Sequence, residues 1–172
     1  MKIHNQQGVG LMEVLVALIL LSIGVLGYTA LQVRAVEAST EAAQRSHAIF
    51  VLKGLAESIR ANNAGRASYM GLVNQDIPNT ISTACINPTT PGCNAAALAR
   101  NDVQQAQANA RNFGLHLRME NCPGTTSVTV ADRRNCLFAA WGETNISQNT
   151  TQCMSVAGVY VVGSSCMMME VY

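Results

Sequence analysis

A long apolar run near the N-terminus carries a single charged residue. From Leu11 to Val33 the only charge belongs to Glu13. As an α-helix this run would be about 34 Å long, at about 1.5 Å per residue. The hydrocarbon core of a bilayer is about 30 Å thick, so the pattern predicts a transmembrane segment over 11–33. Residues 1–8 precede it as a short polar leader.

Helix-forming residues continue beyond the apolar run, but their pattern is different. Between residues 32 and 61 the chain has one glycine and no proline. Its apolar residues recur on one face at helical spacing, at Leu52, Leu55, Ala56 and Ile59. The segment Asn62–Gly65 is a typical helix stop. We therefore expect one long helix over 9–62, apolar all round in its first half and amphipathic in its second. Two helices joined near Gln32 are the alternative.

The composition changes beyond Gly65, where asparagine, threonine, serine, glycine and proline become frequent. We call residues 63–172 the head. Asn94 is a candidate N-cap for a helix in the head that ends near Leu117. The buried stripe of this helix is expected at Ala106, Ala110, Phe113 and Leu117.

Short segments in the C-terminal part of the head predict strands. The four candidates are Thr126–Ala131, Cys136–Trp141, Val156–Val162 and Met167–Tyr172. Turn-forming residues separate them. We expect an antiparallel meander of about four strands laid on the long helix, which makes the fold class α+β.

Six cysteines lie in the second half of the chain, and none forms a C-x-x-C pair. They are Cys85, Cys93, Cys122, Cys136, Cys153 and Cys166. An even number in one region, downstream of a membrane segment, favours disulfides formed outside the cytoplasm over buried reduced thiols. A local Cys85–Cys93 disulfide would close a short loop. Contiguous pairs, Cys122–Cys136 and Cys153–Cys166, are a guess among many connectivities.

Charge and side-chain chemistry argue against several classes of function. Lys+Arg is 11 and Asp+Glu is 10, without a basic run, so a strong nucleic-acid surface is not expected. The histidines His4, His47 and His116 are isolated, and zinc-type ligand spacing is absent. The sequence also has no nucleophile–base pair and no phosphate-binding glycine loop. We expect no enzyme and no metal or cofactor.

Glu13 distinguishes three interpretations of the N-terminus. A plain membrane anchor, or a secretory signal peptide cleaved after Gly27, gains nothing from a carboxylate inside the apolar run. Acids within a membrane segment are usually functional and have a partner. Cleavage after Gly8 would create an α-amine at Val9, one helical turn before Glu13. Amine and carboxylate could then neutralise each other, within one chain or between adjacent chains.

Gly8, Glu13 five positions later and the apolar helix that follows resemble the class III signal of type IV prepilins and pseudopilins. A finer resemblance is to PilV-type minor pilins, on Glu13–Leu18, Leu21–Gly24, Leu26–Gly27 and Leu31–Gln32. Three positions depart from the family pattern. Val9 stands where the family has Phe or Met, Gly10 where it has Thr or Ser, and Ala30 where major pilins have proline.

The resemblance implies a type IV pilin-like fold, in which a long N-terminal helix packs on a small antiparallel head. A prepilin peptidase would cut between Gly8 and Val9 and methylate Val9. The helix would be surrounded by lipid of the inner membrane, with the head in the periplasm. Through the assembly platform the subunit would later enter a surface pilus. Glu13 would pair there with the N-terminal amine of a neighbouring major or minor pilin.

A minor pilin that starts or caps a type IV pilus within a tip complex is the function that this resemblance implies. A type II secretion pseudopilin has the same N-terminus and is one alternative. A tip adhesin or ligand-binding module is another. The near-neutral charge argues against strong DNA affinity in that case.

Overall fold

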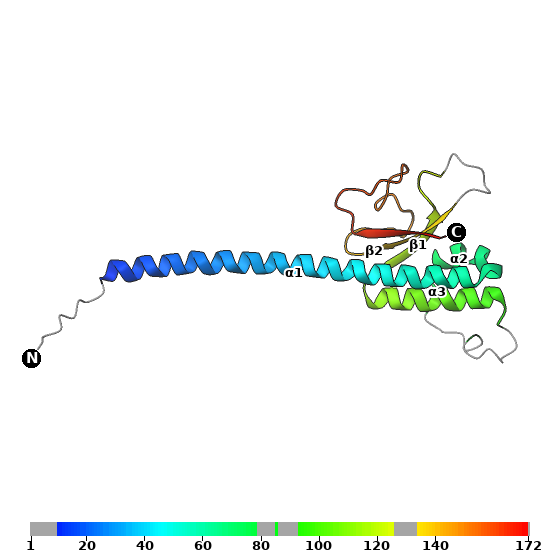
Figure 1. Ribbon diagram of the computed structural model, residues 1–172, viewed down its shortest axis with the longest axis horizontal. Helices are drawn as coiled ribbons and strands as arrows, with labels where there is room; N and C mark the ends of the chain where they lie inside the picture. Colours follow the sequence, from blue (N-terminus) through cyan, green and yellow to red (C-terminus); the bar gives the residue numbers. More distant parts are fainter. Residues whose placement is uncertain (1–9, 79–84, 86–92, 126–133, 172) are drawn as a thin grey trace, which may run out of the picture. The chain divides into compact units, whose positions relative to one another are not determined.

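The computed structural model describes residues 10–78, 85, 93–125 and 134–171 (Figure 1). The chain divides into two compact units, Met1–Ala42 and Ala43–Tyr172. In the described part of the first unit the chain is helical from Leu11 onward. The second unit holds further helices and a three-stranded antiparallel sheet, so the expected α+β fold is present.

The helix α1 (Leu11–Ala61) contributes to both units. It is continuous past Gln32, so the predicted long helix is present and the alternative of two helices is wrong. The predicted apolar stripe is buried, and each of its residues is at most 2% exposed: Leu52, Leu55, Ala56 and Ile59. The helix ends just before Asn62, at the stop that the sequence indicates.

A tight turn follows α1 and leads into η1 (Asn63–Gly65) and α2 (Arg66–Val73), which the sequence pattern does not predict. The side chain of Asn62 accepts a hydrogen bond from the Gly65 N–H at 3.1 Å. It also donates one to the carbonyl of Ala95 at 2.7 Å. A Cβ at Gly65 would lie 2.5 Å from that carbonyl oxygen, so only glycine fits this approach.

Tyr69 connects the three helices of the second unit. Its side chain is fully buried, and its hydroxyl donates to Asp102 of α3 (Ala95–Asn112) at 2.5 Å. The same hydroxyl accepts a hydrogen bond from the Asn62 amide at 3.2 Å. Burial, and then the hydrogen bond to Asp102, raises the pKa of Tyr69. The phenol therefore remains a neutral donor at physiological pH.

The helix α3 begins as predicted but ends before the predicted position. Asn94 caps its first turn through its side-chain oxygen. The predicted end near Leu117 is wrong, because α3 stops at Asn112 and Gly114 follows with a φ of 66°. A left-handed glycine is a common helix terminator. Leu117 lies on a β-strand, although the helical spacing of the apolar residues predicts that it belongs to the helix.

Among the residues that the structure describes, three antiparallel strands form the sheet in the order β1 (His116–Asn121), β2 (Asn135–Ala140) and β3 (Cys166–Val171). β2 and β3 correspond to the predicted strands Cys136–Trp141 and Met167–Tyr172, each beginning one residue earlier. Tyr172 and the candidate Thr126–Ala131 lie outside the described residues.

The predicted strand Val156–Val162 is wrong. This segment forms turns, and its only pairing is one isolated antiparallel bridge between Met154 and Tyr160 among the described residues. Positive φ angles at Gly158 and Gly163 bend the chain at both ends of the valine-rich stretch. The apolar, β-branched composition suits a strand, but these two turns prevent one from forming.

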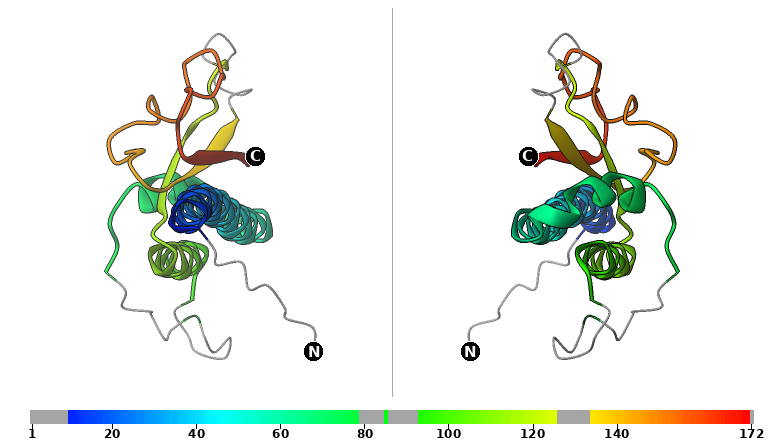
Figure 2. Two further views of the ribbon diagram at one scale, coloured as in Figure 1. Left: turned by 90° about the vertical axis from the view of Figure 1, so that its left-hand side faces the viewer. Right: turned by 90° about the vertical axis from the view of Figure 1, so that its right-hand side faces the viewer.

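The two faces of β2 belong to two apolar clusters. Leu137 and Ala139 pack in the larger cluster, together with the buried stripe on the C-terminal part of α1. Phe138 and Ala140 belong to a second cluster, which includes Ile146. This second face is covered by the connection between β2 and β3, residues 141–165 (Figure 2). The sheet is thus covered on both faces.

Three disulfides are present, and they join the contiguous cysteines as expected from the sequence: Cys85–Cys93, Cys122–Cys136 and Cys153–Cys166. Cys122 follows β1 directly and is bonded diagonally across the strand pair, since its backbone N–H donates to the Arg134 carbonyl at 2.8 Å. Cys153 ties the 141–165 connection to the first residue of β3.

Replacing Leu52 with alanine should lower the free energy of unfolding by about 2–5 kcal/mol, because its fully buried side chain leaves a cavity. Phe50→Ala on the same helix is the control, since Phe50 is 73% exposed and should change stability by about 0.5 kcal/mol or less. Urea unfolding followed by fluorescence of Trp141, the single tryptophan, measures both. Equal effects would contradict the assigned core.

Candidate assembly site

The candidate cleavage site, Gly8 and Val9, lies outside the described residues. The described chain begins at Gly10, whose carbonyl accepts hydrogen bonds from the backbone N–H groups of Glu13 at 2.9 Å and Val14 at 3.3 Å. Gly10 therefore stands immediately before the first turn of α1, and Glu13 lies within that turn. Cleavage and methylation at the Gly8–Val9 bond stay predictions from the sequence.

Glu13 is the only acidic residue in the first turn of α1. A carboxylate near a helix N-terminus is favoured by the partial positive charge of the unpaired N–H groups there. The next charged residue along the helix is Arg34, which pairs with Glu37 at 3.1 Å. Residues 14–33 carry no charge, so no side chain along this part of the helix neutralises Glu13.

The surface of α1 around and beyond Glu13 is apolar and uncovered. The exposed fraction is 85% for Leu11, 69% for Leu26 and 63% for Val36. The hydroxyls of Ser22 and Thr29 are satisfied within the helix, because Ser22 donates to the Ile19 carbonyl at 2.7 Å and Thr29 to that of Leu26. These two hydroxyls therefore need no partner from an apolar environment.

Among the described residues, α1 is the one helix that is long and apolar enough to cross a membrane, judged by length and composition. A signal sequence can satisfy the same criteria. What distinguishes α1 is that the helix continues to Ala61 and that its last turns form part of a folded core. The transmembrane segment expected at 11–33 lies within this helix.

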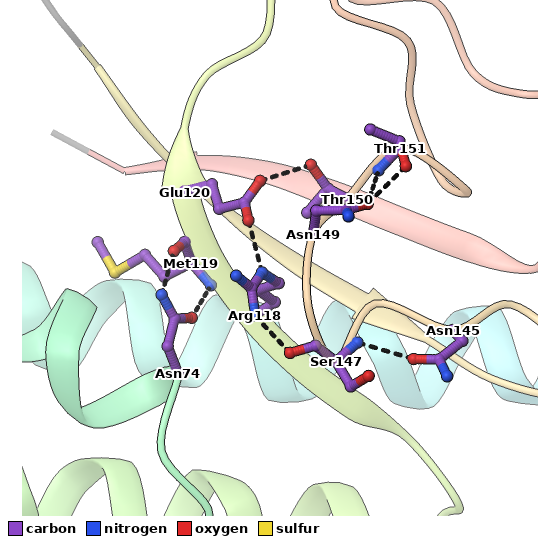
Figure 3. A network of polar contacts seen from close by, with 9 residues as sticks. All are labelled: Asn74, Arg118, Met119, Glu120, Asn145, Ser147, Asn149, Thr150 and Thr151. Carbon is purple, nitrogen blue, oxygen red and sulfur yellow. Dashed lines mark hydrogen bonds and ion pairs between the residues drawn. The ribbon is translucent and has the colours of Figure 1, made fainter.

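The head contains a polar network that sequence reasoning missed (Figure 3). The side-chain amide of Asn74 donates to the Met119 carbonyl at 2.8 Å and accepts from the Met119 N–H at 2.9 Å. Arg118 donates to Glu120 at 2.5 Å and to the Ser147 carbonyl at 2.6 Å. These contacts attach both α2's end and the 141–165 connection to β1.

Glu120 extends this network, because its second carboxylate oxygen accepts from the Thr150 hydroxyl at 2.8 Å. The side chains of Arg118 and Glu120 are 15% and 29% exposed. The pair is therefore partly shielded from water and fixes the connection more firmly than a surface pair would. No sequence signal marks this network, since its long-range bonds join residues 30, 29 and 45 positions apart: Glu120 with Thr150, Arg118 with Ser147, and Asn74 with Met119.

The two histidines of the described part have no catalytic surroundings. His47 stacks on Phe113 with ring centroids 3.9 Å apart, and His116 begins β1. In the described residues no group of three or more His, Cys, Asp or Glu side chains could hold a metal ion.

The long apolar helix, the small antiparallel sheet and the disulfide-containing head form an α+β fold that is consistent with the fold of a type IV pilin. Residues 30–104 match a family described as Type IV pilin Tt1218, and residues 3–29 match the prokaryotic N-terminal methylation motif. The second match includes Gly8, Val9 and Glu13. The two matches adjoin and support a pilin with the methylation motif of prepilins. No curated protein and no solved structure matches the chain.

Asn74→Ala should speed hydrogen exchange at the Met119 amide and lower the free energy of unfolding by about 1–2 kcal/mol, because it removes two hydrogen bonds to the β1 edge. Gln75→Ala is the matched control, since the Gln75 backbone carbonyl accepts from Gln107 and remains in the variant. Native-state hydrogen exchange measures both. Unchanged protection at Met119 in Asn74→Ala would contradict the assigned role of Asn74.

Proposed function

We propose that this chain is a minor pilin of a type IV pilus, which helps to start or cap the filament as part of a tip complex. The observation that carries the proposal is one acidic residue, Glu13, in the first turn of an exposed apolar helix that carries the prepilin methylation motif. A simple anchor does not need that carboxylate.

Processing is the first step of the proposed function. A prepilin peptidase cleaves between Gly8 and Val9 at the cytoplasmic face of the inner membrane and methylates Val9. The apolar part of α1 then holds the subunit in the inner membrane, with the head in the periplasm. The match of residues 3–29 to the N-terminal methylation motif supports this step.

Assembly is the second step. The apolar surface of α1 leaves lipid and packs against the helices of other pilins, so it remains covered throughout. Glu13 pairs with the methylated amine of a neighbouring subunit. Burying either charge alone costs several kcal/mol, so the pair acts as a condition for docking and fixes the axial register. A single uncompensated carboxylate would exclude a subunit that is out of register.

The pilus is favoured over a secretion pseudopilus by one observation. The family that matches residues 30–104 is described as a type IV pilin. The partners of the proposed subunit are therefore other minor and major pilins, the prepilin peptidase and the inner-membrane assembly platform.

The mature protein, purified from membranes or sheared filaments, should begin at N-methylated Val9. Mass spectrometry of the N-terminal peptide measures this directly. A variant with Gly8→Ala should retain the leader, because the peptidase would no longer find its glycine. An N-terminus at Met1 or Tyr28 in the native protein would contradict prepilin processing.

Glu13→Ala should leave processing at Val9 largely intact but lower incorporation into filaments by about tenfold or more, since the neighbour's amine loses its partner. Glu37→Ala is the control on the same helix, because its exposed pair with Arg34 contributes little. Quantitative immunoblots of sheared filaments and of membranes measure both steps. Normal incorporation of Glu13→Ala into filaments would contradict the proposed pairing of Glu13 with a neighbour's N-terminal amine.

A further inference from the structure

The outer edge of β1 has an unpaired position at Leu117. The Cys122 N–H donates to the Arg134 carbonyl, so the even-numbered residues of β1 bond to β2. The backbone groups of Leu117 and Met119 therefore face away from β2. The side chain of Asn74 binds both groups of Met119 (Figure 3). Within the described parts of the chain, the N–H and C=O of Leu117 have no hydrogen-bond partner.

A groove of about 460 Å³ lies beside Leu117, and its accessible rim is polar. The apolar side chains Val73, Leu115 and Ile146 form its floor, since each is at most 2% exposed. A groove of this size can hold several groups of a ligand. Exposed and partly exposed polar side chains from four parts of the head form its rim: Gln75, Asp76, Arg111, His116, Arg118 and Ser147. The groove therefore favours a ligand that forms hydrogen bonds and ion pairs.

Arg111 is anchored in this rim by acceptors from its own head. Its Nη2 atom donates to the Ile77 carbonyl at 3.1 Å and to the Gln107 side-chain oxygen at 3.5 Å. Ile77 and Gln107 are both buried, and the Gln107 amide is fixed in turn by a hydrogen bond to the Val73 carbonyl at 3.2 Å. The Arg111 guanidinium therefore keeps its position when the carboxylate that pairs with it is exchanged for another.

Asp76 is the exchangeable partner of Arg111. Its carboxylate pairs with the Arg111 guanidinium, but its side chain is 92% exposed. An ion pair this exposed contributes little to stability, so a carboxylate from another molecule can replace Asp76 at small cost. In the free protein, Asp76 therefore occupies a position at Arg111 that an acidic ligand can take.

A single residue of an extended ligand can reach both Leu117 and Arg111. The side chain of Leu117 packs on the face of the sheet that α3 covers, and α3 carries Arg111. In an antiparallel strand pair, directly opposite residues place their side chains on the same face. A ligand residue whose backbone pairs with Leu117 therefore directs its side chain to the α3 side of the sheet. If this side chain is acidic, it meets Arg111.

We propose that this groove binds an extended acidic segment of another protein. The carboxylate of one ligand residue replaces Asp76 at Arg111, and the backbone of the same residue pairs with the N–H and C=O of Leu117. Asn74 limits the backbone pairing to this one position, so the ligand has one register. The inference concerns the head alone and goes beyond the proposed pilin function, because it names a class of ligand that the N-terminal helix does not determine.

A peptide matches the chemistry of the groove better than other acidic ligands do. Leu117 offers one backbone donor and one backbone acceptor, which an extended peptide residue matches with its own C=O and N–H. The carboxylate of an acidic sugar would engage Arg111 without using this pair. Nucleic acids bind to clusters of lysine and arginine, whereas the groove has two arginines and also the carboxylate of Asp76.

Titration of the full chain, in detergent micelles, with a short peptide tests the proposal. The probe is acetylated and amidated Thr-Thr-Asp-Thr-Thr, because threonine favours an extended backbone, and the control peptide has Asn in place of Asp. With isotope-labelled leucine in the protein, the amide resonances of Leu115 and Leu117 report binding. We expect the Asp peptide to shift the Leu117 amide and to bind about tenfold more tightly than the Asn peptide.

The two members of the ion pair should have opposite effects on binding. Arg111→Gln should raise the dissociation constant of the Asp peptide about tenfold or more, because the carboxylate loses its guanidinium partner. Asp76→Asn should lower it about twofold to fivefold, because the competing carboxylate is removed. Arg60→Gln is the matched control, since Arg60 is as exposed as Arg111 and pairs with Glu57 away from the groove. A purely structural ion pair would not give opposite effects.

Leu117→Pro tests the backbone contact without changing Arg111. It removes the outward N–H and leaves the bonds to β2 in place, and proline is tolerated on edge strands where the N–H faces outward. The Leu115 amide then reports binding, and we expect a dissociation constant about fivefold or more above the wild-type value. Leu117→Ala is the matched control, since it shortens the side chain but keeps the N–H.

Three results would overturn the inference. The first is equal affinity for the Asp and Asn peptides, or weaker binding of the Asp peptide to Asp76→Asn. The second is the absence of a shift at Leu117 with the peptide at millimolar concentration. The third comes from galacturonate oligomers as an acidic sugar. If they bind as tightly as the Asp peptide, and equally well to Leu117→Pro, the groove binds a carboxylate alone and the proposed peptide partner is wrong.

Discussion

The uncovered apolar surface of α1 is the constraint on which the rest of the structure depends. Burying one large aliphatic side chain is worth about 1.5–3 kcal/mol, and more than a dozen of them are exposed between Leu11 and Val36. Such a surface is stable only when lipid or other apolar helices surround it. Within it, the hydroxyls of Ser22 and Thr29 bond to their own helix, and Glu13 is the only charged residue from Leu11 to Val33. In the proposed assembly, the surroundings of this helix must therefore be apolar and must also supply a positive charge for Glu13.

The second half of α1 is amphipathic and packs into the core of the head. Here one narrow stripe, which includes Leu52 and Ile59, is buried, and the other surfaces carry polar side chains. A head of this size has a small core, and its sheet needs cover on both faces. The helices cover one face, while the 141–165 connection covers the other. The connection is held by the Cys153–Cys166 disulfide, by the hydrogen bond that Thr150 donates to Glu120, and by the one that Arg118 donates to the Ser147 carbonyl. Covalent and polar ties replace the second layer of secondary structure that a larger domain would have.

A structural feature could be predicted from the sequence when its signals lie within a few residues of one another along the chain. The long helix, its buried stripe and its end at Asn62 follow from periodicity and stop residues within a few positions, and all are present. Glu13 was identifiable because one charge in a long apolar run has no local explanation. The end of α3 was missed because the apolar spacing continues through Leu117, although Gly114 turns the chain. The valine segment was mistaken for a strand since its composition is β-prone. Only the fold shows that its backbone is bent into turns.

The contacts that no pattern revealed are the ones that finish the edges of the sheet. Asn74 meets Met119 across 45 positions of sequence, and Tyr160 meets Met168 across a loop. Unpaired strand edges promote indiscriminate pairing between chains, and proteins usually block them. The proposed pilin subunit, which exposes apolar surface on α1, would be particularly vulnerable to such pairing. Blocking β1 at Met119 and β3 at Met168 by single side chains leaves Leu117 as a short opening in a groove. An opening of one residue is too small to serve as a general template for strand pairing.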